Sequence, residues 1–283
     1  MYNRYYGFRE NPFNQTPDSE FFFPSKEHKS VLDALVYALK QRKGFVVVTG
    51  EIGSGKTTVA RTLLRRLGEG MKTAVITNTY LTPKGVITLI LEDLGIAYQP
   101  GSKTELLIQL NEYLINQARQ DLDVIVLIDE AQNLSLSCLE EVRMLSNLET
   151  EKEKLIQIIL MGQPELRRKL ETVRLEQLRQ RIAIYYHLQP LDMEETRDYV
   201  LHRINLAKAN GHNLDTLFDP QTYELIYRST GGLPRLINRL CDHALLTGFV
   251  SDTKVITPSI IEEVISELHF RKEKNYEQIY QSA

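Results

Sequence analysis

The stretch Gly50-Glu51-Ile52-Gly53-Ser54-Gly55-Lys56-Thr57 decides the fold class, because it follows an apolar run, Gly44 to Val48, and precedes a helix-forming segment. In this G-x-x-x-x-G-K-[ST] pattern, backbone N–H groups of a glycine-rich turn between a buried strand and a helix converge on a phosphate. We expect Lys56 to reach the β and γ phosphates and the Thr57 hydroxyl to hold Mg2+. The sequence therefore predicts a nucleotide site that uses Gly50, Glu51, Ile52, Gly53, Ser54, Gly55, Lys56, Thr57 and Thr58.

Composition limits the class of protein. A chain of 283 residues with 42% apolar residues can form one large domain or two modest ones. Its apolar runs are shorter than the ~18 residues that cross a bilayer, and its first residues do not resemble a secretory signal. We therefore expect a cytoplasmic protein, at most peripheral to the inner membrane. The net charge of -3 argues against a surface dominated by nucleic-acid binding.

The two cysteines, Cys138 and Cys241, are far apart, and neither has a neighbour at a metal-ligand spacing. Two buried thiols in a reducing compartment are the expected outcome. We predict no metal other than Mg2+.

Short apolar runs alternate with helical stripes up to Pro190. Strands are expected at 45–49, 74–77, 124–129, 155–161 and 182–187, with helices at 30–40, after Gly55, and near 86–94, 104–120 and 138–148. This alternation predicts an α/β fold with a five-stranded parallel sheet covered by helices on both faces. Only helical stripes follow, at 194–209, 221–229, 233–248 and 258–268. The expected organisation is an N-terminal strap (1–30), a phosphate-loop domain (31–190), a small helical domain (191–269) and a polar tail (270–283).

The N-terminal segment carries eight aromatic residues in its first 23 positions, which is unlike a solvated tail. Pro12, Pro17 and Pro24 disfavour a regular helix, so an extended strap packed onto the body of the protein is predicted. Its aromatic rings could form a wall for the adenine ring or simply belong to a core.

A second motif is the apolar strand Val124 to Ile128, which ends in the adjacent carboxylates Asp129 and Glu130. Ligands of parallel-sheet proteins bind at the carboxyl ends of the strands, beside the phosphate loop. Asp129 suits the Mg2+ shell, since a hard cation that bridges phosphates prefers oxygen ligands. Glu130 suits the general base that polarises the attacking water.

Further polar residues could surround the γ phosphate, as phosphoryl transfer requires. Gln163 follows the strand 155–161 and is placed to orient the water. Arg179 and Arg181 precede the last strand, and Arg235 opens a helix of the second domain. Each arginine could equally lie on a solvated helix face.

Taken together, the phosphate loop, Ile128-Asp129-Glu130, Gln163, an arginine before the fifth strand and Gly232-Leu233-Pro234-Arg235 resemble the AAA+ ATPases. A narrower resemblance is to the ExeA, or general secretion pathway protein A, family. It rests on Tyr5-Tyr6-Gly7-Phe8, Asn11-Pro12-Phe13, Thr16-Pro17-Asp18, Thr49-Gly50-Glu51, Asp129-Glu130-Ala131-Gln132, Gly162-Gln163-Pro164-Glu165-Leu166 and Leu178-Arg179-Gln180-Arg181-Ile182. These matches extend from about residue 5 to about residue 240.

The resemblance implies roles for these residues. Gln163 would be sensor 1, Arg181 the arginine finger offered to a neighbouring subunit's ATP, with Arg179 as its rival, and Arg235 sensor 2 within a helical lid. The chain would be a homo-oligomeric ATPase with shared active sites, and ATP hydrolysis would help to assemble a secretion or type IV pilus secretin complex. Family members that remodel the envelope continue into a membrane span and a peptidoglycan-binding region, so this chain is expected to be either an ATPase fragment or a standalone member.

Three other roles stay open. One is a DNA-loading adaptor that regulates transposition, for which the six basic and three acidic residues of 165–181 could contact DNA, although a subunit interface explains them as well. The others are an ATPase of an exopolysaccharide or protein-sorting locus, and a nucleotide-binding scaffold without turnover.

Overall fold

The computed structural model describes residues 2–16, 18–68, 70–151, 153–211 and 214–268, so the tail expected over 270–283 lies outside the described residues. The chain divides into two compact units. One, here called the sheet unit, comprises residues 26–51 and 56–188; the other, the helical unit, comprises the described parts of residues 1–25, 52–55 and 189–283. Among the described residues, no helix combines the length and the apolar character needed to cross a membrane.

Five parallel strands form the centre of the sheet unit, which confirms the predicted sheet. They are β1 Phe45–Gly50, β2 Met71–Ile76, β3 Asp123–Ile128, β4 Gln157–Gly162 and β5 Ile184–Leu188, in the order β2-β3-β4-β1-β5. Every residue of β1 and β4 is buried, as expected for inner strands covered on both faces. The edge strand β2 begins three residues before the predicted start. The prediction missed these residues because they are not fully buried and do not form an apolar run. Since the strands are parallel, β1, β3 and β4 end at the same edge of the sheet.

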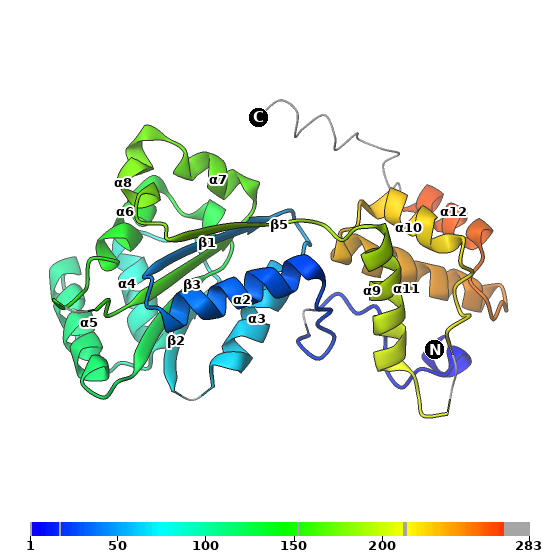
Figure 1. Ribbon diagram of the computed structural model, residues 1–283, viewed down its shortest axis with the longest axis horizontal. Coiled ribbons are helices and arrows are strands. Elements are labelled where there is room, and N and C mark those ends of the chain that lie inside the picture. Colours follow the sequence, from blue (N-terminus) through cyan, green and yellow to red (C-terminus); the bar gives the residue numbers. More distant parts are fainter. Residues whose placement is uncertain (1, 17, 69, 152, 212–213, 269–283) are drawn as a thin grey trace. The chain divides into compact units, whose positions relative to one another are not determined.

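Helices cover both faces of this sheet, as Figure 1 shows. The helices of the sheet unit are α2 Lys26–Lys40, α3 Lys56–Leu67, α4 Pro83–Asp93, α5 Lys103–Ala118, α6 Leu136–Leu145, α7 Pro164–Leu170 and α8 Glu176–Arg179, with the short 3-10 turns η1 Ala131–Asn133 and η2 Val173–Leu175. α2 and α3 pack on one face, and α4 and α5 pack on the other beside β2 and β3. α2 begins four residues earlier than predicted, because its first residues are polar and lie before the apolar stripe that indicated the helix. Ser30 lies inside the helix, where its hydroxyl donates to the Lys26 carbonyl at 2.8 Å.

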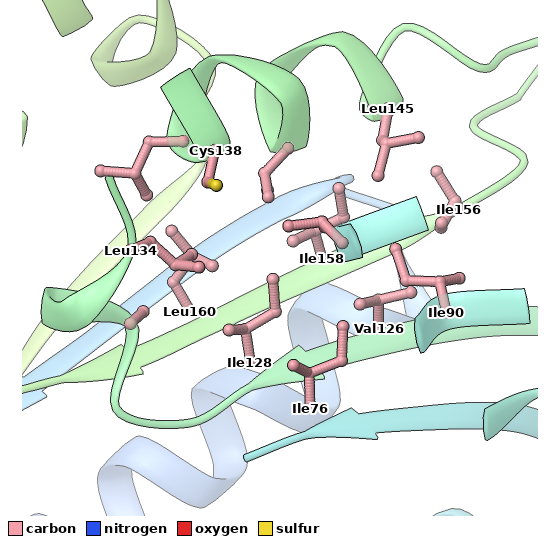
Figure 2. Packing of buried hydrophobic residues seen from close by; sticks show 14 of the residues in the cluster. Ile76, Ile90, Val126, Ile128, Leu134, Cys138, Leu145, Ile156, Ile158 and Leu160 are labelled. Atoms are coloured by element: carbon pink, nitrogen blue, oxygen red, sulfur yellow. The ribbon is translucent and has the colours of Figure 1, made fainter. Parts of the chain in front are cut away.

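The larger hydrophobic core lies between the sheet and the second of these helical layers. Figure 2 shows Ile76, Val126, Ile128, Ile158 and Leu160 of the strands beside Ile90, Leu134, Cys138 and Leu145. The residues that alternate with these along the strands, such as Ile125 and Leu127, point to the other face of the sheet and are also buried. Both faces of the sheet are therefore covered. Cys138 in this core and Cys241 in the helical unit are both buried and free of disulfides, as expected.

The helical unit contains the helices α1 Tyr2–Tyr6, α9 Met193–Ala207, α10 Thr222–Thr230, α11 Pro234–Val250 and α12 Pro258–Glu267. The strap predicted as extended contains the short helix α1, which ends before Pro12 and therefore avoids the proline restriction. Tyr6, Phe8, Phe13 and Phe21 share one buried cluster with the inner faces of α9 to α12. For these four side chains the interpretation as core residues is confirmed.

A buried cation holds the strap in the helical unit. Arg203 of α9 is 6% exposed and donates to the carbonyls of Pro12 at 2.6 Å and Asn14 at 3.3 Å. It also donates to the Tyr199 hydroxyl at 2.9 Å, and its guanidinium lies 4.8 Å from the centre of the Phe21 ring. Because the strap's carbonyls satisfy a buried charge, strap and helices form a single packed unit.

Candidate functional site

The phosphate-loop motif lies where the sequence places it, between the end of β1 and the start of α3. Gly53 and Gly55 have φ values of +81° and +100°, a backbone conformation that side chains other than glycine rarely adopt. The loop thus requires glycine for its conformation. The N-terminus of a twelve-residue helix follows it directly, and such a terminus favours an anion.

Lys56 lies under this loop and is 6% exposed. Its Nζ donates to the carbonyl oxygens of Gly50 at 2.8 Å and of Glu51 at 2.9 Å. Burial lowers the pKa of Lys56, and the carboxylates of Glu130 and Asp129 act in the opposite direction. The ammonium group is therefore anchored at the loop by backbone carbonyls and faces a cluster of acidic side chains.

Thr57 and Asp129 are brought together from sequence positions 72 residues apart. The Thr57 hydroxyl donates to Asp129 Oδ2 at 2.8 Å, and the backbone N–H of Glu130 donates to Asp129 Oδ1 at 2.9 Å. Asp129 is 5% exposed and follows the last residue of β3. This pairing gives two hard oxygen donors beside the phosphate loop. Thr58 lies in the first turn of α3, where its carbonyl accepts from the Thr62 hydroxyl at 2.8 Å.

Glu130 has a left-handed backbone conformation, with φ of +51°, immediately before η1. Its Oε2 accepts a hydrogen bond from Gln163 Nε2 at 3.0 Å and another from Gln132 Nε2. Gln163 follows the last residue of β4, as predicted, so the structure brings the two predicted residues into direct contact. Gln132 was not predicted as a functional residue; the only sequence signal was its place two residues after Glu130.

A second polar cluster at the end of β1 was also missed. The buried Thr49 hydroxyl lies 2.8 Å from Tyr185 Oη and 2.9 Å from His187 Nδ1, both on β5. Burial lowers the pKa of His187, the carboxylate of Glu51 acts in the opposite direction, and the positive charges of Arg167 and Lys56 add to the lowering. A polar residue at the end of an otherwise apolar strand was the available signal.

The predicted arginines are not gathered around Glu130. Arg181 is half-buried, and its Nη1 donates to Ser146 Oγ at 3.4 Å. Ser146 caps the C-terminal end of α6, whereas Glu130 precedes the N-terminal end. Arg179 is exposed at the end of α8. Arg235 is exposed in the first turn of α11, where its backbone N–H donates to the carbonyl of Gly53 at 3.2 Å within the helical unit.

Sequence comparison identifies close relatives. Residues 39–170 match the family model described as an AAA domain. Over 250 residues, which is 88% of this chain, the sequence is 38% identical to general secretion pathway protein A of Aeromonas hydrophila. The chain covers 45% of that protein, so it spans about half the length of this relative.

Solved structures with the same fold include the following three proteins. The ORC2 protein of Aeropyrum pernix superposes with a TM-score of 0.70 at 16% identity, covering 96% of this chain and 75% of that chain. CDC6P of Pyrobaculum aerophilum gives 0.68 at 20% identity, covering 88% and 71%. The RuvB Holliday junction branch migration motor of Thermotoga maritima gives 0.61 at 18% identity, covering 92% and 75%.

At these low identities the structural likeness establishes the fold, and the sequence relative establishes the family. Both agree with a phosphate loop that follows the buried strand β1 and with carboxylates that follow β3, on the other side of β4. Residues 39–170 therefore form an AAA domain, and the chain belongs to the family that includes general secretion pathway protein A.

Proposed function

We propose that this chain is a Mg2+-dependent ATPase that oligomerises when it binds ATP and uses hydrolysis to drive assembly of a secretion or type IV pilus envelope complex. The 38% identity to general secretion pathway protein A over 88% of this chain carries the pathway part of the proposal. The chemical part is supported by the contacts that join Asp129 at the end of β3 to Thr57, and Gln163 at the end of β4 to Glu130.

The donor set fits Mg2+. The Thr57 hydroxyl and the Asp129 carboxylate are hard oxygen ligands, and their 2.8 Å contact places both within reach of one small cation. When bound, the ion would neutralise charge that develops on the phosphates.

In the proposed reaction, Lys56 places its positive charge on the terminal phosphates, and the turn ending at Gly55 supplies backbone N–H groups. Glu130 accepts a proton from water as the water oxygen attacks the γ phosphorus. The bond from the γ phosphorus to the bridging oxygen breaks, which leaves ADP and inorganic phosphate. Gln163 orients the water, and its 3.0 Å bond to Glu130 keeps the amide beside the base.

A complete site also requires a positive charge on the far side of the γ phosphate. Since Arg181 lies at the end of α6 remote from Glu130 of its own chain, it is better placed to serve a neighbouring subunit. A finger in trans can contribute ~10³-fold or more to turnover, so an isolated subunit should hydrolyse ATP slowly. Arg179 is the rival finger, and Arg235 would act within its own subunit as sensor 2.

Mixing experiments test this shared site. Arg181→Ala should lower kcat and spare ATP binding, and Glu130→Gln should bind ATP but retain only a small residual kcat. Mixed, the two impaired proteins should regain activity, because some interfaces then combine an intact Glu130 with an intact Arg181. Arg179→Ala is tested in parallel, and the arginine whose loss lowers kcat and is rescued by mixing is the arginine finger. If neither arginine variant is rescued, the shared-site model is wrong.

Two experiments test the biological role. In the organism that carries the protein, a deletion strain should fail to assemble the secretin, and the wild type but not Glu130→Gln should restore assembly.

DNA binding that depends on ATP and decreases steeply with salt would instead favour the DNA-loading adaptor. The basic segment gives this alternative limited support, since Arg167 pairs with Glu171 at 2.9 Å and Arg168 with Glu165 at 3.5 Å. A polysaccharide or protein-sorting role would be indicated by the genes adjacent to this one.

A further inference from the structure

Gln132 spans the gap between the ends of β3 and β4. Its Oε1 accepts the backbone N–H of Gln163 at 3.0 Å, and its Nε2 donates to Glu130 Oε2. The side chain is buried, with 8% exposure. A single amide therefore connects the carboxylate that follows one strand to the backbone that follows the next.

Chemistry fixes the orientation of this amide. The backbone N–H of Gln163 can only donate, so it requires the oxygen of Gln132. The NH2 group is thereby directed at Glu130, whose ionised carboxylate can only accept. The opposite orientation would place two donors against each other and two acceptors against each other, leaving buried polar groups unsatisfied.

Two neighbours hold Gln132 in position. The Lys169 ammonium of α7 donates to the backbone carbonyl of Gln132, and also to that of Leu134 at 3.0 Å, which fixes the η1 turn. At the end of β4, a Cβ on Gly162 would lie 2.9 Å from Gln132 Oε1, so a side chain at residue 162 would displace this amide from its present position.

The result is a Glu130 carboxylate with one constrained oxygen. Oε2 accepts from both Gln132 and Gln163, which leaves Oε1 to accept from water. Without these bonds the glutamate side chain could occupy several staggered rotamers, and only some of them would face the substrate.

We propose that Gln132 is a positioning residue for ATP hydrolysis: it fixes the Glu130 carboxylate in the orientation that accepts the proton of the attacking water. This inference rests on the proposed role of Glu130 as general base. It adds to that role a residue that does not itself touch ATP.

The test removes the amide while keeping side-chain bulk. Gln132→Leu and Gln132→Met should bind a fluorescent ATP analogue within about twofold of wild type, while kcat for phosphate release falls roughly ten- to a hundredfold, the effect expected from losing a hydrogen bond to a charged group. KM should change little. Asn133→Ala, at the next and exposed position, is the matched control and should retain wild-type kcat.

A double-mutant cycle separates positioning from a general structural effect. In a Glu130→Gln background, Gln132→Leu should reduce the residual kcat no further, because the carboxylate base that Gln132 orients has already been removed. A wild-type or higher kcat in both Gln132 variants, a full multiplicative loss in the double mutant, or loss of ATP binding in both variants would each overturn the proposal. Wild-type turnover in Glu130→Gln alone would instead overturn the role of the base.

Discussion

Replacing Asp129 with Asn tests the proposed Mg2+ site with little change in shape. The carboxylate accepts from the Thr57 hydroxyl at 2.8 Å and from the backbone N–H of Glu130 at 2.9 Å. An asparagine can keep its oxygen on that N–H and donate its NH2 to Thr57, whose hydroxyl can turn and accept. Both contacts therefore survive without the negative charge.

The free energies can be worked from these two contacts. A hydrogen bond to a charged group contributes ~1.5–3 kcal/mol and a neutral one ~1 kcal/mol, so two weakened bonds cost ~1–4 kcal/mol. Asp129 is 5% exposed, so its ionised carboxylate carries a desolvation cost in the folded protein. The neutral asparagine does not carry this cost, and the saving offsets a loss of similar size from the two weakened hydrogen bonds. In the absence of ligand, the free energy of unfolding should change by no more than ~2 kcal/mol.

The effect of ligand is measured separately from this change, as the increase in stability that ligand adds to each variant. A ligand at a hundred times its Kd stabilises a protein by ~2.7 kcal/mol, and a hundredfold loss of affinity reduces this to ~0.4 kcal/mol. The missing ~2.3 kcal/mol corresponds to roughly 5–9 °C in Tm for a domain of ~200 residues.

Thermal unfolding with ATP, in the presence of Mg2+ or of a chelator, measures this difference. Asp123→Asn is the matched control: it lies at the opposite end of β3, where Asp123 pairs with Arg42 at 2.9 Å, and it should keep the full Mg2+ increment. The reasoning is refuted if Asp129→Asn retains the wild-type increment, or if it is unfolded before any ligand is added.

Three other substitutions are expected to have separable effects. Lys56→Ala should lose most of the ATP affinity in equilibrium binding, and unchanged binding would show that the loop does not hold the phosphates. Phe13→Ala should lower the free energy of unfolding of the helical unit by ~3–5 kcal/mol in denaturant titrations, whereas Val250→Ala, which is 77% exposed, should change it by no more than ~0.5 kcal/mol. Because burial lowers the pKa of His187, the unfolded chain binds its proton more readily, so stability should fall as the pH falls through the ordinary histidine range. His187→Gln should make the measured stability less dependent on pH over that range, and an unchanged slope would contradict this assignment.

The sequence pattern predicts those elements that are determined by residues adjacent in the sequence. The run ending at Val48 makes β1, and the glycines at 53 and 55 make the turn, so the phosphate loop can be read directly from the sequence. The start of α2 was predicted four residues late, because the first residues of this helix are polar and do not belong to its apolar stripe.

Features that depend on distant contacts could not be predicted. Gln132 acquires a partner 31 residues later, and its place in Asp129-Glu130-Ala131-Gln132 does not reveal that contact. The aromatic strap is expected to pack onto the body of the protein, but the sequence pattern does not indicate which of the two units it joins. The edge-to-face contact of Phe13 with Phe218, at 6.2 Å between ring centres, decides that it packs within the helical unit.

The shared core of strap and C-terminal helices has a consequence for biosynthesis. Phe13 and Phe21 leave the ribosome first, whereas the helices that enclose them, beginning with α9 at Met193, are made last. At ~5–20 residues per second, these aromatic rings wait on the order of 10 s or longer for their partners. During that interval the intervening sheet can complete its own folding, while the nascent N-terminus presents apolar surface to chaperones.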